Sequence, residues 1–277
     1  MPAAALPELV TLAIDAALAA GREILDVYAG PIAVERKQDA SPLTEADRRA
    51  HRAIAAALAA AGLPLLSEEG RALPAAERRR WERYWLVDPL DGTKEFVRRN
   101  GEFTVNIALM ERVAEPEAAD GVAVPVAGVL YAPVRDLLYF SWRGGGAFRQ
   151  DGAGAPGVAA AARAAAARRL PCASARAAYT IVASRSHSSP ETEAFIREAE
   201  REHGRVELAS LGSALKICLV AEGAADVYPR FAPTMEWDTA AGHAIALEAG
   251  RDLVDPASGA ALRYNKLDLV NPWFLVR

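Results

Sequence analysis

The stretch 84–93, YWLVDPLDGT, determines most of what this sequence predicts about fold and chemistry. Its first four residues are large and apolar, which is typical of a buried β-strand. We expect the strand to end at Asp88-Pro89, because proline has a fixed φ and no amide hydrogen. Asp88 and Asp91 lie three residues apart, and Gly92 allows a tight turn after them. Such a turn can direct both carboxylates and an intervening carbonyl at one point.

Carboxylate and carbonyl oxygens are the ligands that Mg²⁺ prefers in proteins. Thr93 adds a hydroxyl group, and the amides of Gly92 and Thr93 can contact a phosphate. The competing interpretation is a surface turn of the Asp-Pro and Asp-Gly type, which 88–93 taken alone fits equally well. The choice between a metal site and a turn therefore depends on the rest of the chain.

Three further acids stand where a helix or strand begins or ends. Glu68 follows a short apolar run, and Asp47 lies three residues after Thr44, in a pattern that resembles a capping box. Asp238 stands at the start of a helix expected over 239–249, where an N-cap is its ordinary role. A helix N-terminus also favours a nearby anion through its dipole and free amides.

Composition sets limits on the class of protein. The chain has 277 residues, of which 52% are hydrophobic, so it can form one large domain or two closely associated ones. A net charge of −4, from 32 basic and 36 acidic residues, excludes a basic nucleic-acid binder. The two cysteines lack metal-site spacing and favour a reducing, cytoplasmic location. No uncharged apolar stretch reaches the length of a transmembrane segment.

Periodicity predicts a mixed α/β chain in two halves. The expected helices are 6–28, 44–61, 190–203, 211–221 and 239–249, and the expected strands are 84–87, 103–110, 126–131, 137–140, 180–183 and 226–228. The first helix is interpreted as part of the mature protein and not as a signal peptide. The Gly/Ala-rich segment 151–169 is expected to be a surface connection between an N-terminal α+β half, 1–165, and a C-terminal α/β half, 166–277.

Taken together, the motifs resemble those of the inositol monophosphatase superfamily, which consists of lithium-sensitive, Mg²⁺-dependent phosphatases. The superfamily resemblance rests on 68–69 (EE), 88–93 (DPLDGT) and 237–242 (WDTAAG). Further runs are similar to the 3'(2'),5'-bisphosphate nucleotidase branch of the CysQ type: 85–96 (WLVDPLDGTKEF), 99–106 (RNGEFTVN), 184–187 (SRSH), 219–223 (LVAEG) and 228–231 (YPRF). Glu95 stands where inositol phosphatases tend to have Asn, which also favours this branch. The chain departs from the pattern in enlarged loops at 114–124 and 151–169.

The resemblance implies a layered α-β-α-β-α sandwich of the inositol monophosphatase and sugar phosphatase type, with the site between the two halves. It also implies two to three Mg²⁺ ions, held mostly by the N-terminal half. The implied ligands are Glu68, Asp88 and the Leu90 carbonyl for one ion, Asp88, Asp91 and Asp238 for a second, and Glu68 with Asp47 for a weaker third.

The same resemblance assigns catalysis and substrate binding. Thr93, paired with Asp47, would orient and deprotonate the attacking water, with Glu68 as a further catalytic residue. The implied substrate contacts are Gly92, Thr93, His187, Ser213, Lys216, Arg230 and Asp238. Lys216 and Arg230 make chemical sense there, because a bisphosphorylated nucleotide carries a second dianion that an inositol monophosphate lacks.

The sequence thus favours a Mg²⁺-dependent phosphomonoesterase that removes the 3'-phosphate of adenosine 3',5'-bisphosphate, giving AMP and phosphate. This compound is a by-product of sulfur metabolism, and the 3'-phosphorylated sulfate donor is a second expected substrate. An inositol monophosphatase or broad sugar phosphatase is the alternative. A regulatory protein without turnover is the least favoured, because the acids and Thr93 are all present. Monomer and homodimer both stay open, as does a peripheral position at the inner membrane.

Overall fold

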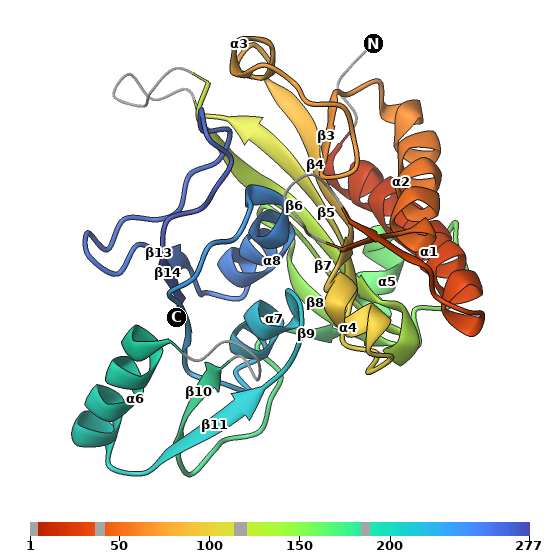
Figure 1. The fold of residues 1–277 in the computed structure, drawn as a ribbon. Coiled ribbons are helices and arrows are strands. Elements are labelled where there is room, and N and C mark those ends of the chain that lie inside the picture. The colour runs from red at the N-terminus through yellow and green to blue at the C-terminus, as the bar shows by residue number, and fades with distance from the viewer. Residues whose placement is uncertain (1–4, 37–41, 114–120, 184–188) are drawn as a thin grey trace.

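A computed structural model describes residues 5–36, 42–113, 121–183 and 189–277. Helices and strands alternate in layers, in the order α-β-α-β-α (Figure 1). The predicted layered sandwich is therefore confirmed. Among the helices of these described residues, none has both the length and the apolar character needed to cross a membrane.

The first layer consists of α1 (Leu6–Ala29) and α2 (Glu45–Leu58), which pack against each other and against one face of the large sheet. Buried residues of α1 recur at helical spacing, as at Leu9, Ala13 and Ala17, and this pattern gave the correct prediction of the helix.

Thr44 caps the N-terminal end of α2, as predicted. Its backbone amide donates to the carboxylate of Asp47, which completes a capping box with Asp in place of Glu. The helix ends at Leu58, somewhat before the predicted end at 61. A 3₁₀ turn, η1 (Ala59–Ala61), follows it and leads to Gly62 in the left-handed conformation.

The second layer is a seven-stranded sheet in the order β3-β4-β5-β6-β7-β8-β9. Its strands are β3 (Leu65–Ser67), β4 (Arg83–Asp91), β5 (Thr104–Arg112), β6 (Ala123–Ala132), β7 (Leu137–Trp142), β8 (Gly146–Asp151) and β9 (Arg168–Arg169). β3 runs parallel to β4, and all other neighbours are antiparallel. Helices cover both faces of this sheet, which explains why β4 is a continuous apolar run without polar alternation.

β4 corrects one prediction. The strand does not end at Asp88-Pro89 but continues to Asp91. Its pairing with β5 is irregular between Asp88, opposite Asn106, and Asp91, opposite Thr104. Pro89 is tolerated because it lies in this irregular segment. In a regular ladder, the residue at this position could need an amide hydrogen, which proline lacks.

The third layer consists of α7 (Leu215–Ala221) and α8 (Glu236–Glu248), on the other face of the sheet. Contact is close because small residues meet. A Cβ added to Gly128 of β6 would lie 2.2 Å from the carbonyl oxygen of Ala241. This close packing places the N-terminal end of α8, with Asp238, beside the end of β4.

The remaining layers are smaller. A parallel pair, β10 (Tyr179–Ala183) and β11 (Val206–Ser210), lies near a sheet of β12 (Tyr228–Arg230), β14 (Phe274–Val276) and β13 (Leu253–Val254), with α6 (Pro190–His203) outside them. The other elements are β1 (Val34–Arg36), β2 (Pro42–Thr44), α3 (Ala75–Arg78), α4 (Thr93–Val97) and η2 (Pro133–Arg135). Sequence patterns missed β8, β11, β13 and β14, and they placed the start of α7 four residues early, at 211.

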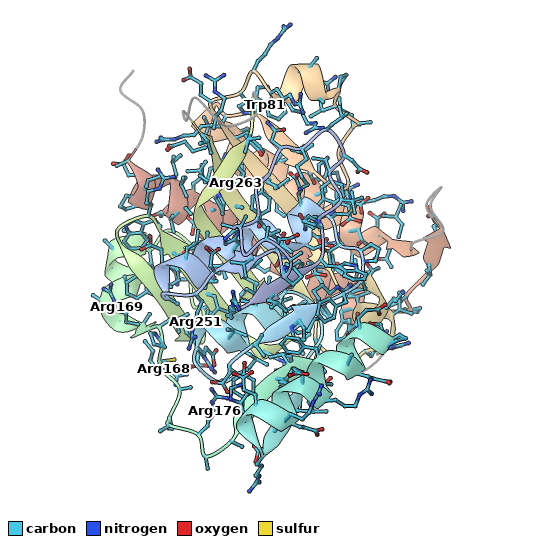
Figure 2. All side chains as sticks on the ribbon, turned by 90° about the vertical axis from the view of Figure 1, so that its left-hand side faces the viewer. Trp81, Arg168, Arg169, Arg176, Arg251 and Arg263 are labelled. Atoms are coloured by element: carbon cyan, nitrogen blue, oxygen red, sulfur yellow. The ribbon has the colours of Figure 1, made fainter. Side chains whose placement is uncertain are left out.

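The segment 151–169 is more than a surface connection. It contains α5 (Ala160–Ala166), which packs on α1, and it ends in β9 of the large sheet. The Arg163 guanidinium is buried and donates to the backbone carbonyls of Ala153 and Ala155. Arg168 and Arg169, by contrast, are exposed on the face that Figure 2 shows. The alanine-rich pattern concealed the helix, because a buried alanine and an exposed one read alike in the sequence.

The division into halves at 165 and 166 stays a prediction. The large sheet takes in β9, just beyond that boundary, and α8 of the C-terminal half lies directly on this sheet. Of the enlarged loop 114–124, residues 114–120 lie outside the described part of the chain.

Candidate active site

Parallel pairing of β3 and β4 brings the first acids together. Ser67 lies opposite Val87 in the register, and the amide of Glu68 donates to the Val87 carbonyl, at 3.1 Å. Glu68, which directly follows β3, and Asp88 of β4 therefore lie side by side at the same end of the parallel pair. Asp88 is buried, and one of its oxygens accepts a hydrogen bond from the Leu90 amide, at 3.0 Å.

Asp91 lies at the end of β4 and reaches across to the C-terminal half. Its Oδ2 accepts a hydrogen bond from the Ala214 amide, at 2.6 Å, and a longer one from Asn106 Nδ2, at 3.3 Å. Gly92 follows with a φ of +94°, and a Cβ there would lie 3.2 Å from the Glu102 carbonyl oxygen. Glycine is thus needed both for the conformation and for the close approach.

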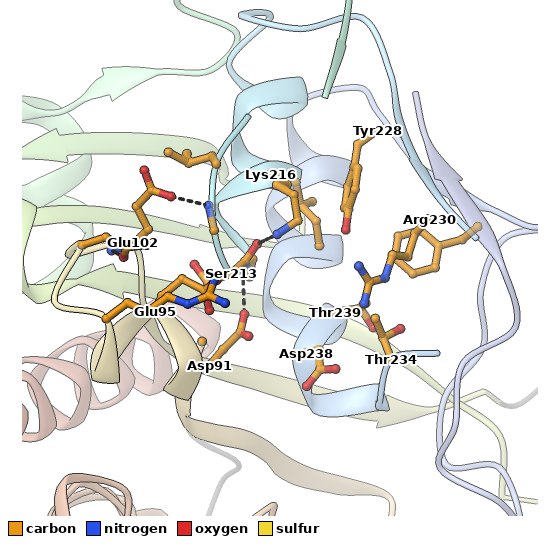
Figure 3. A pocket seen from close by; sticks show the side chains of 18 residues that line it. Asp91, Glu95, Glu102, Ser213, Lys216, Tyr228, Arg230, Thr234, Asp238 and Thr239 are labelled. Atoms are coloured by element: carbon orange, nitrogen blue, oxygen red, sulfur yellow. Dashed lines mark hydrogen bonds between the residues drawn. The ribbon is translucent and has the colours of Figure 1, made fainter. Parts of the chain in front are cut away.

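Asp238 corrects a second prediction. The N-cap of α8 is Met235, and Asp238 is the third helical residue. Its carboxylate bonds back to the Met235 amide, at 2.8 Å. Asp238 therefore does stabilise the helix start, but from inside the helix, which turns its carboxylate toward the cavity beside Asp91 (Figure 3).

These acids raise one another's pKa. The pKa of Asp88 lies well above its usual value, first because the side chain is removed from water, and then because Glu68, Asp91 and Asp238 repel its charge. The pKa of Asp238 is also well above its usual value, from burial and from the charge of Asp91. Buried acids that raise one another's pKa in this way are typical of functional sites.

Two cations offset part of this charge. Burial raises the pKa of Asp91, and the positive charge of Lys216 opposes that rise most strongly, followed by the bond from Ala214. The positive charge of Arg230 likewise opposes the rise in the pKa of Asp238. Positive charge from Lys216 and Arg230 thus acts on the acids of the cluster.

Thr93 and Asp47 come together from α4 and α2. Thr93 Oγ1 lies 3.4 Å from Asp47 Oδ1 and 3.4 Å from the Leu90 carbonyl oxygen. The other oxygen of Asp47 accepts from the amide and the hydroxyl of Thr44, at 2.7 and 2.6 Å. Asp47 therefore caps its helix and also faces Thr93, so the two interpretations of this acid do not compete.

A cavity of about 320 Å³ opens beside Asp91 and Asp238, and Lys216 and Arg230 also line it (Figure 3). Lys216 is buried on α7, and its Nζ donates to the Ser213 carbonyl at 2.7 Å and lies 5.6 Å from the centre of the Tyr228 ring. Arg230 donates to the Pro233 carbonyl, at 3.2 Å. Ser213 has a φ of +50°, which is uncommon for a residue with a side chain.

Six of the twelve predicted site residues line this cavity: Asp91, Gly92, Ser213, Lys216, Arg230 and Asp238. Asp47, Glu68, Asp88, Leu90 and Thr93 are not among the described residues that line it. His187 lies outside the described residues. Sequence reasoning also missed several residues that line the cavity: Arg98, Asn100, Glu102, Tyr228, Thr234, Thr239 and Phe274. Four of them stand inside quoted motifs, which were the available signal: Asn100 and Glu102 in 99–106, Tyr228 in 228–231 and Thr239 in 237–242.

The acids fit a hard cation in charge and in donor type. Burial of several carboxylates with raised pKa values calls for positive charge that Lys216 and Arg230 only partly supply. Within the described residues, no group of three acidic, histidine or cysteine side chains is already arranged to hold a metal ion. The carboxylates of Asp47, Asp91 and Asp238 bond to backbone amides instead. The individual ligand assignments therefore stay predictions.

Comparison with known proteins places the chain in a family. The model of the inositol monophosphatase family matches residues 5–274. The chain belongs to the inositol monophosphatase family. Members of this family are metal-dependent phosphatases. This family member is 44% identical over 263 residues to the 3'(2'),5'-bisphosphate nucleotidase CysQ of Salmonella typhimurium, covering 93% of this chain and 94% of that protein.

Other relatives agree with the match. The protein of the same name from Escherichia coli K12 is 42% identical over 263 residues, with the same shares covered, 93% and 94%. The crystal structure of CysQ from Bacteroides thetaiotaomicron superposes with a TM-score of 0.88 at 52% identity, covering 98% of this chain and 97% of that one. SuhB from Bartonella henselae is more distant, with a TM-score of 0.69 at 26% identity, covering 96% and 92%. This family member is thus more similar to these CysQ proteins than to that SuhB.

Proposed function

We propose that this inositol monophosphatase family member is a Mg²⁺-dependent 3'(2'),5'-bisphosphate nucleotidase. It hydrolyses the 3'-phosphate of adenosine 3',5'-bisphosphate to give AMP and phosphate, and it also accepts the 3'-phosphorylated sulfate donor. The observation that carries the proposal is a cavity with a cluster of acids on one side and Lys216 and Arg230 on the other. The names of relatives that are 42% and 44% identical along nearly the whole chain support the same substrate.

The acids are the residues that would hold the cations. We assign to this role Glu68, Asp88, the Leu90 carbonyl, Asp91 and Asp238, with Asp47 near a weaker position. Bound Mg²⁺ supplies charge to offset the phosphate and lowers the pKa of water, as in two-metal phosphatases generally. Two to three ions fit the number of carboxylates, because five acids and a phosphate ester cannot share a cavity without that charge.

The Thr93 and Asp47 pair prepares the attacking water. Thr93 Oγ1 can accept a hydrogen bond from water while donating its own hydrogen to Asp47 Oδ1, 3.4 Å away. The water oxygen bonds to phosphorus as the bond from phosphorus to the 3' oxygen breaks. The proton of the water moves through Thr93 to Asp47. The departing 3' oxygen takes a proton from solvent and becomes the hydroxyl of AMP, and Asp47 later returns its proton to solvent. The Gly92 and Thr93 amides and the N-terminal end of α8 hold the phosphoryl oxygens.

Selectivity for a nucleotide with two phosphates comes from the cations. Lys216 and Arg230 lie on elements of the C-terminal half and act electrostatically on Asp91 and Asp238. A second phosphate placed between them gains two charge-assisted contacts that an inositol monophosphate cannot make. His187 and Ser213 are assigned to the nucleotide as well, from the sequence motif.

A cytoplasmic location is also part of the proposal. Both cysteines, Cys172 and Cys218, are free thiols, as expected in a reducing compartment. We propose a monomer or a homodimer in solution, with a small molecule and not a nucleic acid as the partner.

Hydrolysis assays with three phosphate esters test the proposed function. Purified protein with Mg²⁺ is given adenosine 3',5'-bisphosphate, inositol 1-phosphate and fructose 1,6-bisphosphate. We expect kcat/KM to be at least about tenfold higher for the nucleotide, a difference of roughly 1.4 kcal/mol in transition-state binding.

A tenfold preference for the inositol ester would instead assign the chain to the inositol phosphatases. Absence of turnover with all three esters, in a folded protein with Mg²⁺ present, would favour a regulatory role. Omission of Mg²⁺ serves as the control, because a nucleotidase of this family should then lose activity with every substrate.

A further inference from the structure

The segment that carries Ser213 and Lys216 is held to the N-terminal half by two carboxylates. Gly212 donates its amide hydrogen to Glu102 Oε2, at 2.9 Å, and Ala214 donates to Asp91 Oδ2, at 2.6 Å (Figure 3). Ser213, between them, has a left-handed φ of +50°. Such a conformation persists in a non-glycine residue only where the surroundings fix it. The hydrogen bonds donated by the Gly212 and Ala214 amides fix the Ser213 conformation from both sides.

Ser213 and Lys216 depend on each other and on this conformation. The Ser213 carbonyl accepts the hydrogen bond of Lys216 Nζ, at 2.7 Å, so a rotation of the Ser213 backbone would move the ammonium group. Ser213 Oγ is buried at the cavity, and it has no hydrogen-bond partner among the described residues. A buried hydroxyl of this kind is available to a ligand.

Glu102 is well suited to hold the segment. Its side chain is only 8% exposed, and Oε1 pairs with Arg135 Nη2, at 3.2 Å, on the side away from Gly212. Its own amide donates to Asn100 Oδ1, at 2.9 Å, which fixes the backbone of the turn before β5. The carboxyl group is therefore oriented by both partners and nearly out of water.

The fit between the two segments is tight. A Cβ added to Gly212 would lie 2.6 Å from the Glu102 carbonyl oxygen, 2.8 Å from its Cβ and 2.9 Å from Glu95 Cγ. The backbone of Gly212 thus packs directly on Glu102, and any larger residue at 212 must push the segment away from the N-terminal half.

We propose that Glu102 is a positioning residue for substrate selectivity, which holds Gly212 so that Ser213 and Lys216 meet the second phosphate of the substrate. Glu102 itself does not touch the reacting atoms in this proposal. The role of Glu102 in selectivity rests on the proposed nucleotidase function. The positioning of Gly212 by Glu102 does not depend on that function.

The first test compares adenosine 3',5'-bisphosphate with adenosine 3'-monophosphate, which has the same reacting phosphate but lacks the second one. For Glu102→Ala we expect KM for the bisphosphate to rise on the order of tenfold, as for loss of a charge-assisted contact. The kcat of both substrates and KM for the monophosphate should change by less than about threefold, because the reacting groups stay in place.

Three further variants separate positioning from general damage. Glu102→Gln keeps an oxygen that can accept from Gly212, so it should recover most of the selectivity. Gly212→Ala displaces the same segment without a change of charge and should reproduce the selectivity loss, which also covers the case in which Glu102→Ala does not fold. Glu82→Ala, whose side chain is 87% exposed, is the matched acidic control and should behave as the wild type.

Amide hydrogen exchange tests the hold on Gly212 without any substrate. Peptides that cover 211–217 should exchange about tenfold faster in Glu102→Ala than in the wild type, and at the wild-type rate in Glu82→Ala. Unchanged exchange of these peptides in Glu102→Ala would contradict the claim that Glu102 holds Gly212 in place. Equal losses of kcat/KM for both nucleotides would overturn the selectivity role. Failure of the wild type on the bisphosphate would overturn the proposed function and the selectivity role together, and the exchange result would still decide whether Glu102 holds Gly212.

Discussion

Two acids in the first turn of α8, Glu236 and Asp238, are two residues apart but have opposite environments. Glu236 is fully buried, and its oxygens accept from the amides of Asn265 and Lys266, at 2.7 and 3.0 Å, and from Lys266 Nζ, at 2.6 Å. Asp238 accepts one backbone amide, from Met235, and faces the charges of other acids.

The difference shows what separates a structural acid from a functional one. Burial raises the pKa of Glu236, but Lys266 and two amides oppose the rise, so its charge is compensated inside the protein. Burial and the negative charge of Asp91 raise the pKa of Asp238 well above its usual value, although the Met235 amide and Arg230 oppose this. An acid whose negative charge is not balanced by neighbouring groups of the folded chain is suited to bind a cation.

The largest expected effect concerns the acid cluster to which Asp238 belongs. Asp91→Asn should lower kcat/KM on the order of 10³-fold, roughly 4 kcal/mol, because the cluster loses a charge needed for cation binding. The fold should persist, since Asn can still accept the Ala214 amide hydrogen. Steady-state kinetics together with circular dichroism measure both properties, and near wild-type rates would remove the metal assignment.

The compensated acid should behave in the opposite way. Glu236→Gln should lower the free energy of unfolding by about 3 kcal/mol, because Lys266 loses its buried partner. The matched variant Asp238→Asn should leave the stability of the metal-free protein unchanged or higher, because it relieves repulsion. Urea denaturation of both variants in EDTA gives the comparison, and equal losses of stability would contradict it.

The stabilisation of the fold by Mg²⁺ gives a third comparison of Glu236 and Asp238. In the wild type, Mg²⁺ at about a hundredfold excess over Kd should stabilise the fold by about 2.7 kcal/mol, and EDTA should reverse this. Glu236→Gln should keep the Mg²⁺-dependent rise in Tm, whereas Asp238→Asn should lose most of it. Thermal denaturation with and without Mg²⁺ decides the matter. A rise of equal size in both variants would exclude Asp238 as a ligand.

The smallest expected effect concerns the two lysines that accompany these acids. Lys216→Ala should raise KM for adenosine 3',5'-bisphosphate about tenfold, roughly 1.4 kcal/mol, and affect adenosine 3'-monophosphate much less. Lys266→Ala should lower stability and leave the ratio between the two substrates unchanged. Equal losses for both substrates in Lys216→Ala would break the assignment of that lysine to the second phosphate.

Local sequence predicted several elements of the site correctly. The apolar run before Asp88, the capping pattern of Thr44 and Asp47, and the helix 190–203 all depend on neighbouring residues, and all appear in the structure. Short strands such as β13 and β14 were missed because they are held by pairing with distant residues and not by their own propensity. The same holds for the irregular end of β4, whose partner, β5, lies further along the chain.

The amino-acid sequence was enough to identify the acids of 88–91 and the hydroxyl of Thr93, and the layered fold followed from the resemblance of its motifs to a known family. Tertiary structure alone decided which acids are compensated. Glu236 meets Lys266 and Asp91 meets Ala214 only because distant segments pack together. The partners are 30 and 123 residues apart in the sequence. It also decided that Glu102, an ordinary acid in the sequence, meets the amide of Gly212. The reason is physical, because the energy of a buried charge depends on the groups around it in space and not on its neighbours along the chain.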